Sequence, residues 1–195
     1  SALNWAIPVY AHIPLIHGED GKKLSKRNAA TSVIEYKKMG YPAAAMRNYL
    51  ARLGWSHGDD EFFTDEQAKT WFNLESIGKS PSRFDFKKLS NISKLHIANT
   101  DNAALLHQLT GYLKAVGQPA FSQAQLNSLL KSLDFTKNAV KNFSELIEKN
   151  RFILQERPIS LDPDFEERIE DLPLNVLKIL TPQLQNVRWQ RNCLE

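Results

Sequence analysis

The sequence predicts a mainly α-helical chain that begins with a short β segment. Apolar residues recur at helical spacing, behind readable capping residues, across most of residues 32–147. Residues 10–16 instead alternate along too short a stretch for a helix. No run of about 18 apolar residues occurs, and the N-terminus lacks the basic and apolar stretches of a signal peptide. We therefore expect no membrane segment and a cytoplasmic location.

The β segment is expected to end at a tight turn. The residues Gly18-Glu19-Asp20-Gly21 combine two glycines with two carboxylates, a composition that lets the chain reverse. A polar run over residues 22–28 follows directly. We expect this run to be an exposed loop.

A first group of helices is predicted between residues 32 and 99. Ser32 and Glu35 fit a capping box, Gly40 suits a helix end, and Pro42 suits the first position of the next helix. That second helix carries an apolar stripe of Met46, Tyr49, Leu50 and Leu53 before Gly54. Further starts are expected at the Thr64–Gln67 capping box and at Asp85, whose helix places Leu89, Ile92 and His96 on one side. A break is expected at residues 80–82.

The chain becomes richer in leucine after residue 100, where we predict a domain boundary. Three apolar stripes are expected to form a core there: Leu105, Leu106, Leu109, Tyr112, Leu113 and Val116; Leu126, Leu129, Leu130 and Leu133; and Val140, Phe143 and Ile147. Residues 117–119 and 133–135 are predicted to separate them. Further helix signals occur at residues 164–171 and 173–180.

Charge and cysteine content restrict the kinds of site to be expected. The single cysteine, Cys193, and five scattered histidines lack the spacing of metal ligands, so we expect no metal site and no structural zinc. The net charge is only +3, yet residues 20–52 hold eight cations and two carboxylates. This basic region indicates either a solvated face or a surface for phosphate or nucleic acid.

One loop carries residues suited to phosphate chemistry. Lys23-Leu24-Ser25-Lys26-Arg27 places two lysines three residues apart, directly after the expected strand and turn. Lysine is a compact point charge with three rotatable donors, and a mobile loop can close over a triphosphate. A crowded phosphate in a transition state needs such positioned cations. Five residues alone remain a weak signal, because many lysine-rich loops contain them.

The surroundings of this loop carry a family resemblance. Residues 13–27 resemble the signature region of bacterial glutamyl-tRNA synthetases, which are class I aminoacyl-tRNA synthetases. The resemblance covers about residues 5–98 strongly, and it continues through Ala30–Val33, Tyr36, Gly40-Tyr41, Asn48–Ala51, Leu53–Ser56, Gly58-Asp59, Ser80-Pro81 and Phe84-Asp85. Beyond residue 100 it rests on helical character, with weaker echoes at Leu180–Pro182 and Gln185.

The resemblance implies a domain order, a reaction and a site. Residues 1–30 would end the catalytic nucleotide-binding fold, residues 31–99 would form the stem-contact helical domain, and residues 100–195 an incomplete α-helical anticodon-binding region. The full enzyme would use ATP with Mg²⁺ to join glutamate to tRNA(Glu) through a glutamyl-adenylate. Lys26 would contact ATP, Lys23 and Arg27 would support phosphate binding, and Ser25 would shape the loop.

The chain also lacks a part that the family needs. No His-x-Gly-His signature occurs in it, so we expect a C-terminal part of such an enzyme, monomeric and inactive by itself. At residues 91–96 the family commonly shows a Trp-Leu-Asn-Gly-like run followed by a tyrosine. Here Asn91-Ile92-Ser93-Lys94 precede His96, which puts the packing or tRNA contact of that helix in doubt.

Several alternatives remain open at this point. The chain could be a non-catalytic tRNA-binding module, a synthetase that charges tRNA(Gln), or a helical scaffold with a coincidental lysine loop. The leucine stripes speak against the glutamine enzyme, whose anticodon-binding part is largely β-barrel. Arg47 and Arg52 could contact tRNA phosphates or simply be solvated. Trp5, Trp55 and Trp71 are expected to make core or subdomain contacts rather than to stack on bases.

Overall fold

The structure is a computed structural model that describes residues 10, 12–18, 20–24, 32–155, 178–179 and 181–182. Residues 1–154 form one compact unit and residues 155–195 a second. In the second unit, residues 178–179 and 181–182 are helical. The helix signals at residues 164–171, and most of those at 173–180, lie outside the described residues.

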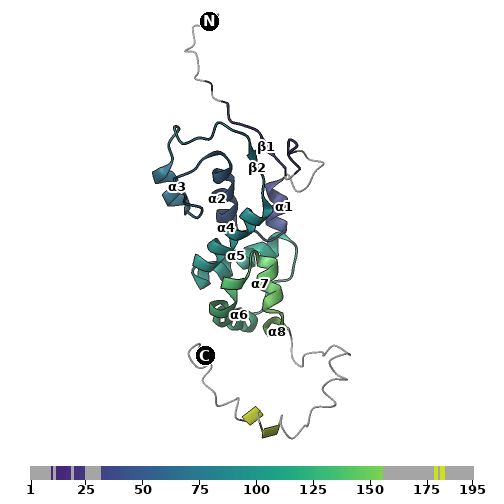
Figure 1. The fold of residues 1–195 in the computed structure, drawn as a ribbon. Helices are drawn as coiled ribbons and strands as arrows, with labels where there is room; N and C mark the ends of the chain where they lie inside the picture. The colour runs from purple at the N-terminus through teal and green to yellow at the C-terminus, as the bar shows by residue number, and fades with distance from the viewer. Residues whose placement is uncertain are drawn as a thin grey trace, which may run out of the picture. The chain divides into compact units, whose positions relative to one another are not determined.

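The elements of the first unit confirm a mainly helical chain with a small sheet (Figure 1). They are, in order, β1 (Ile16–His17), α1 (Val33–Lys38), α2 (Ala43–Gly54), α3 (Asp65–Trp71), β2 (Ser82–Arg83), α4 (Phe86–Asn99), α5 (Asn102–Ala115), α6 (Gln123–Thr136), the 3-10 helix η1 (Lys137–Ala139), α7 (Phe143–Lys149) and α8 (Arg151–Leu154). Within the described residues, every helix is too short or too polar to cross a lipid bilayer.

The helix starts follow the capping residues that the sequence offers. Thr64 forms a full capping box with Gln67, and the Asp85 carboxylate accepts from the backbone N–H groups of Lys87 and Lys88. Ser32 also caps its helix, accepting from Ile34 N–H at 3.3 Å. The expected capping box there is wrong in one detail: the Glu35 carboxylate binds Lys38 at 3.0 Å instead of reaching back.

The first core lies between α1, α2, α4 and the two strands. Its buried members are Tyr36, Met46, Tyr49, Phe84, Leu89 and Ile92. The predicted stripe on α2 is only partly right, because Leu50 is 39% exposed whereas Asn48 is 2% exposed. Asn48 can be buried because its amide bonds the backbone of Glu61 and Phe63.

The second core joins α5, α6, α7 and α8. It buries Ile97, Leu105, Leu109, Leu129, Leu133, Val140, Phe143, Leu146 and Leu154, which include members of all three predicted stripes. The break predicted at residues 133–135 is wrong, because α6 continues to Thr136. Leu133 faces the core while Asp134 lies outside and accepts a hydrogen bond from Asn102. The Leu-Asp-Phe sequence therefore reflects the two faces of one helix.

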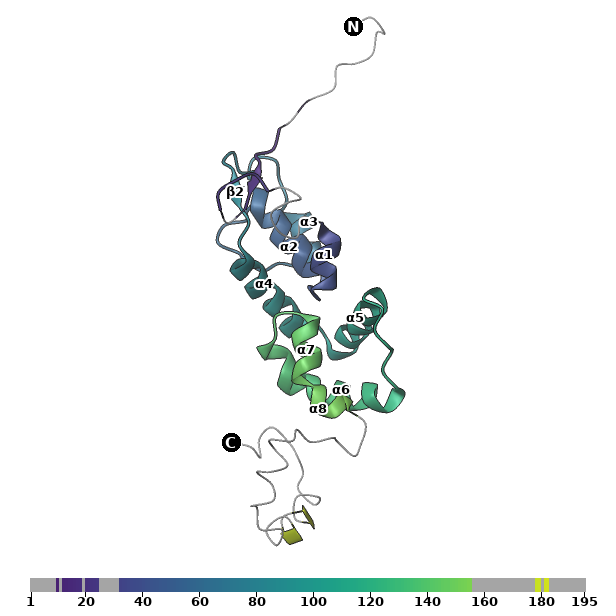
Figure 2. The same cartoon turned by 90° about the vertical axis from the view of Figure 1, so that its right-hand side faces the viewer.

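Helix α4 contributes to both cores. Leu89 and Ile92 belong to the first and Ile97 to the second. In both ribbon views α4 runs from the end that holds α1–α3 and the strands toward the end that holds α6–α8 (Figures 1 and 2). The domain limits predicted near residues 30 and 100 remain predictions.

The two strands form a parallel pair that the sequence did not reveal. Ile16 pairs with Ser82 and His17 with Arg83, and Phe84 N–H donates to His17 O at 2.8 Å. Residues 80–82 were expected only to break the chain. The pairing fixes the start of α4 beside the turn that precedes the lysine motif.

Candidate functional site

The turn after β1 is closed by its own backbone. Gly18 N–H donates to Lys22 O at 2.8 Å, and Gly21 N–H donates to Gly18 O at 3.0 Å. Gly21 has φ +74°, a conformation that glycine adopts without strain. The Asp20 carboxylate accepts from Lys22 N–H at 3.0 Å. The predicted reversal of the chain is confirmed, and it brings Lys23 back beside β1.

Lys23 is held at this edge with its side chain in solvent. It forms an antiparallel bridge with His17, and Leu24 N–H donates to Ile16 O at 3.0 Å. Leu24 and Ile16 pack on the first core, whereas Lys23 is exposed. Alternation along the strand therefore directs the ammonium group away from the core.

Ser25, Lys26 and Arg27 lie outside the described residues. Of the five predicted site residues, the structure thus places Lys23 and Leu24, and Leu24 serves the core. The phosphate-binding roles of Lys23, Lys26 and Arg27 remain predictions.

Arg83 is a residue near this site that the sequence reasoning missed. It lies beside His17 in the sheet, and a Cβ built on Gly21 would be 3.3 Å from its guanidinium Nη2. No local pattern could have indicated this position. The two segments lie far apart in the chain and meet only through the β1–β2 pairing.

The two arginines of α2 form ion pairs, and both sequence alternatives for them, contact with tRNA phosphates or a solvated position, stay open. The Arg47 Nε–H donates to Asp65 Oδ1 at 2.9 Å, and Arg52 lies 3.8 Å from the Glu61 carboxylate. The hydrogen bonds from Arg47 hold the pKa of Asp65 below its usual value, against an opposing effect of burial. The positive charge of the α2 surface is thereby reduced.

The departure from the family pattern on α4 is accommodated within the packing. His96 is 8% exposed, its Nε2 lies 2.9 Å from Asn48 Oδ1, and its ring lies 4.7 Å from that of Phe62. Burial lowers the pKa of His96 to about 4; the Asp65 charge raises this pKa by a smaller amount, and the Arg47 charge lowers it further. The buried Ser93 hydroxyl donates to Lys141 O. The packing of this helix, doubted from the sequence, is intact.

The described tryptophans serve packing, as expected. Trp55 is buried with its ring 5.6 Å from that of Phe63, edge to face. Trp71 stacks on His57 at 4.3 Å between ring centroids. Trp5 lies outside the described residues. The roles of Trp55 and Trp71 are therefore accounted for by the folded chain itself.

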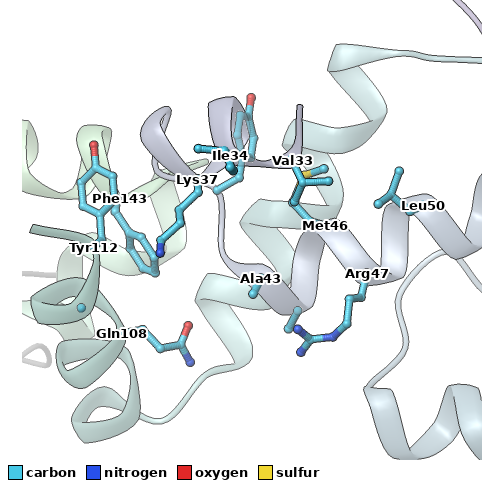
Figure 3. Close-up of a pocket in the computed structure, with 13 residues that line it drawn as sticks. Val33, Ile34, Lys37, Ala43, Met46, Arg47, Leu50, Gln108, Tyr112 and Phe143 are labelled. Atoms are coloured by element: carbon cyan, nitrogen blue, oxygen red, sulfur yellow. The ribbon is translucent and has the colours of Figure 1, made fainter. Parts of the chain in front are cut away.

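A cavity of about 590 Å³ lies between α1, α2, α5 and α7. Figure 3 shows Tyr112, Phe143 and Gln108 on one side, Met46, Leu50 and Arg47 on the other, and Lys37 between them. Its lining is mostly apolar and includes the exposed Val33 and Ile34. Such a surface does not suit a triphosphate, whereas exposed cations lie near β1.

Metal ligands do not gather in the part of the chain that the structure describes. No group of three or more His, Cys, Asp or Glu side chains lies close enough there to hold an ion. The site near β1 is defined by cations and a glycine turn.

Comparison with known proteins finds similarity along the whole chain. Residues 1–91 match the family model for the catalytic domain of class I tRNA synthetases (E and Q). Over the whole chain, the sequence is 55% identical to glutamate–tRNA ligase 1 of Jannaschia sp. (strain CCS1) and 57% identical to glutamate–tRNA ligase 2 of Ruegeria pomeroyi. The chain is a homologue of the glutamate–tRNA ligases. It spans 42% of the length of each of these two glutamate–tRNA ligases.

Solved structures agree at the level of the fold. A glutamate tRNA ligase from Elizabethkingia meningosepticum, crystallised with its amino acid, superimposes with a TM-score of 0.68 at 24% identity, covering 96% of this chain and 40% of the other. A glutamate–tRNA synthetase from Elizabethkingia anophelis superimposes with a TM-score of 0.61. The similarity to glutamate–tRNA ligases along the entire chain favours the leading interpretation over a coincidental lysine loop.

Proposed function

We propose that the protein containing this chain is a glutamate–tRNA ligase. It would activate glutamate with ATP, form a glutamyl-adenylate, and transfer the glutamyl group to tRNA(Glu). The observation that carries this proposal is the identity above 50%, over 194 or 195 residues, to proteins of that name. The exposed Lys23, held at the edge of β1 and without a carboxylate partner among the described residues, supports it.

Within this proposal, the chain supplies two things. The lysine motif would neutralise phosphate charge, with Lys26 as the contact to ATP and Lys23 and Arg27 beside it. The helices beyond it would hold tRNA, whose phosphates attract the exposed cations of residues 20–52 that are not paired. Mg²⁺ would accompany ATP, and we expect no structural zinc in this part of the enzyme. We also propose a monomeric, cytoplasmic enzyme, and we expect no glutamylation from this chain alone.

Glutamylation of tRNA by the full-length protein tests the proposal. With ATP, Mg²⁺, glutamate and tRNA(Glu), the wild-type enzyme should form Glu-tRNA, and glutamine should not replace glutamate. Lys26→Ala should reduce the rate at least about a hundred-fold, because it removes a cation from the phosphate transition state. Lys79→Ala, an exposed lysine of equal charge, is the matched control and should remain near wild type.

Two results would contradict different parts of this proposal. A wild-type protein that charges no tRNA with glutamate would overturn the function itself. A Lys26→Ala enzyme within a few-fold of wild type would leave the function standing and remove Lys26 from the site.

A further inference from the structure

Three basic side chains form a row on one face of the small sheet. His17 lies in the middle, with Lys23 paired on one side and Arg83 on the other. Directly paired residues on neighbouring strands project their side chains to the same face. The flanking residues Ile16, Leu24 and Phe84 pack on the first core, so this row faces away from it.

Arg83 differs from the other arginines of the described residues in having no carboxylate partner. Arg47 binds Asp65, Arg52 lies 3.8 Å from Glu61, and Arg151 lies 3.7 Å from Glu148. Arg83 is exposed and forms no ion pair with any residue that the structure describes. A guanidinium group that no carboxylate of the described residues neutralises is available for an external anion.

Gly21 leaves room for this guanidinium group beside the turn. A side chain at position 21 would begin 3.3 Å from Arg83 Nη2, closer than ordinary van der Waals contact, and the φ of +74° would strain it further. The turn therefore keeps the space next to Arg83 open. Gly21 follows Asp20 directly and lies two residues before Lys23, the first lysine of the motif.

We propose that Arg83 is a phosphate-binding residue that acts together with Lys23, and that its ligand is the triphosphate of ATP. This inference rests on the proposed function and names a further residue of the same site. Arginine presents a planar fork of donors that matches the geometry of phosphate oxygens, whereas lysine is a point charge. The pair combines both kinds of cation on the exposed face of the sheet.

Binding of inorganic tripolyphosphate to the 195-residue chain tests the inference without any enzymatic step. In calorimetric titrations at low salt, Arg83→Ala should weaken binding about ten-fold, as expected for loss of a charge-assisted hydrogen bond. Arg83→Lys should recover part of the affinity. Arg151→Ala removes the same charge at a distant exposed site and should bind like wild type.

Several outcomes of this titration would overturn the inference. They are no tripolyphosphate binding by the wild-type chain, equal affinity for wild type and Arg83→Ala, or equal losses for Arg83→Ala and Arg151→Ala. Matching thermal unfolding midpoints for the variants would exclude a folding defect as the cause, and because Arg83 pairs through its backbone we expect them to match.

Kinetics of the full-length enzyme distinguish the nucleotide from tRNA as the source of the phosphate. Arg83→Ala should raise KM for ATP several-fold and leave KM for tRNA unchanged. A rise in KM for tRNA alone would overturn the assignment to ATP. Failure of the wild-type enzyme to glutamylate tRNA would instead overturn the proposed function, and the tripolyphosphate titration would still report on Arg83.

Discussion

The Nε2 atom of His96 lies 2.9 Å from Oδ1 of Asn48 inside the first unit, joining α4 to α2. The Asn48 Nδ2 group donates to Glu61 O, so its Oδ1 faces His96 and Phe63 N–H and accepts from both. His96 must therefore carry its proton on Nε2. The Asn48 amide thus hydrogen-bonds a side chain of α4 and two backbone groups of the loop before α3.

The buried histidine should make stability depend on pH. Burial lowers the pKa of His96 from 6.5 to about 4, so the unfolded chain binds more protons between these values. The contribution of the neutral, buried imidazole to the free energy of unfolding is complete above pH 6.5. It is lost as the pH falls toward 4, and the loss is roughly 3 kcal/mol at most. Urea unfolding at pH 7 and pH 4.5 should show a larger loss for wild type than for His96→Gln. Equal losses would contradict this.

Truncation of Asn48 should be costly because it leaves buried groups without partners. In Asn48→Ala, Phe63 N–H and His96 Nε2–H both lose their acceptor. We expect a loss of about 2–3 kcal/mol in the free energy of unfolding, measured with urea. Asn91→Ala, at an exposed position of α4, is the control and should change stability by less than about 0.5 kcal/mol.

The Arg47–Asp65 pair should contribute little to stability despite its geometry. Both side chains are substantially exposed, at 57% and 37%, so solvent screens their attraction. A double-mutant cycle with Arg47→Ala and Asp65→Ala should give a coupling of about 1 kcal/mol or less, decreasing with salt. NMR titration of Arg47→Ala should show the pKa of Asp65 rising toward its usual value. An unchanged pKa would rule out Arg47 as the cause.

Gly40 should tolerate no side chain. Its φ is +87°, and an added Cβ would lie 3.0 Å from the backbone nitrogens of Phe143 and Ser144. Gly40 O also accepts from Phe143 N–H at 2.8 Å, so the two segments cannot separate freely. Gly40→Ala should therefore lower the free energy of unfolding by about 1–3 kcal/mol.

The matched control for Gly40 lies within α5. Gly111 has no atom within 4 Å of an added Cβ and no positive φ. Gly111→Ala should stabilise the chain by about 0.5–1 kcal/mol, because it removes the entropic cost of glycine in a helix. Similar destabilisation by both substitutions would show that the contact at Phe143 is not responsible.

Local patterns accounted for most of the helices. Capping residues such as Thr64 and Asp85 act on backbone groups two or three positions away, so the sequence displays both partners. The leucine stripes were also predictable, because the spacing of the leucines indicates which face of each helix is buried. The error at residues 133–135 arose because a polar residue on the outer face of α6 resembles a loop signal.

The remaining features depend on partners that lie far apart in the sequence. The burial of Asn48 requires His96 and the backbone of Phe63, and the position of Arg83 requires the pairing of β2 with β1. Neither relationship leaves a periodic signal. The lysine motif was recognisable from the sequence, whereas Arg83, which pairs with His17 on the side opposite Lys23, was not.

Helix α4 has a mechanical consequence for the whole first unit. Its 14 residues give it a length of about 21 Å, and an α-helix bends little over such a distance. One end follows directly after Arg83 and Phe84, and the other reaches the second core through Ile97. A tilt imposed at the start of α4, beside the paired residues His17 and Arg83, would therefore reach the leucine-rich helices through Ile97.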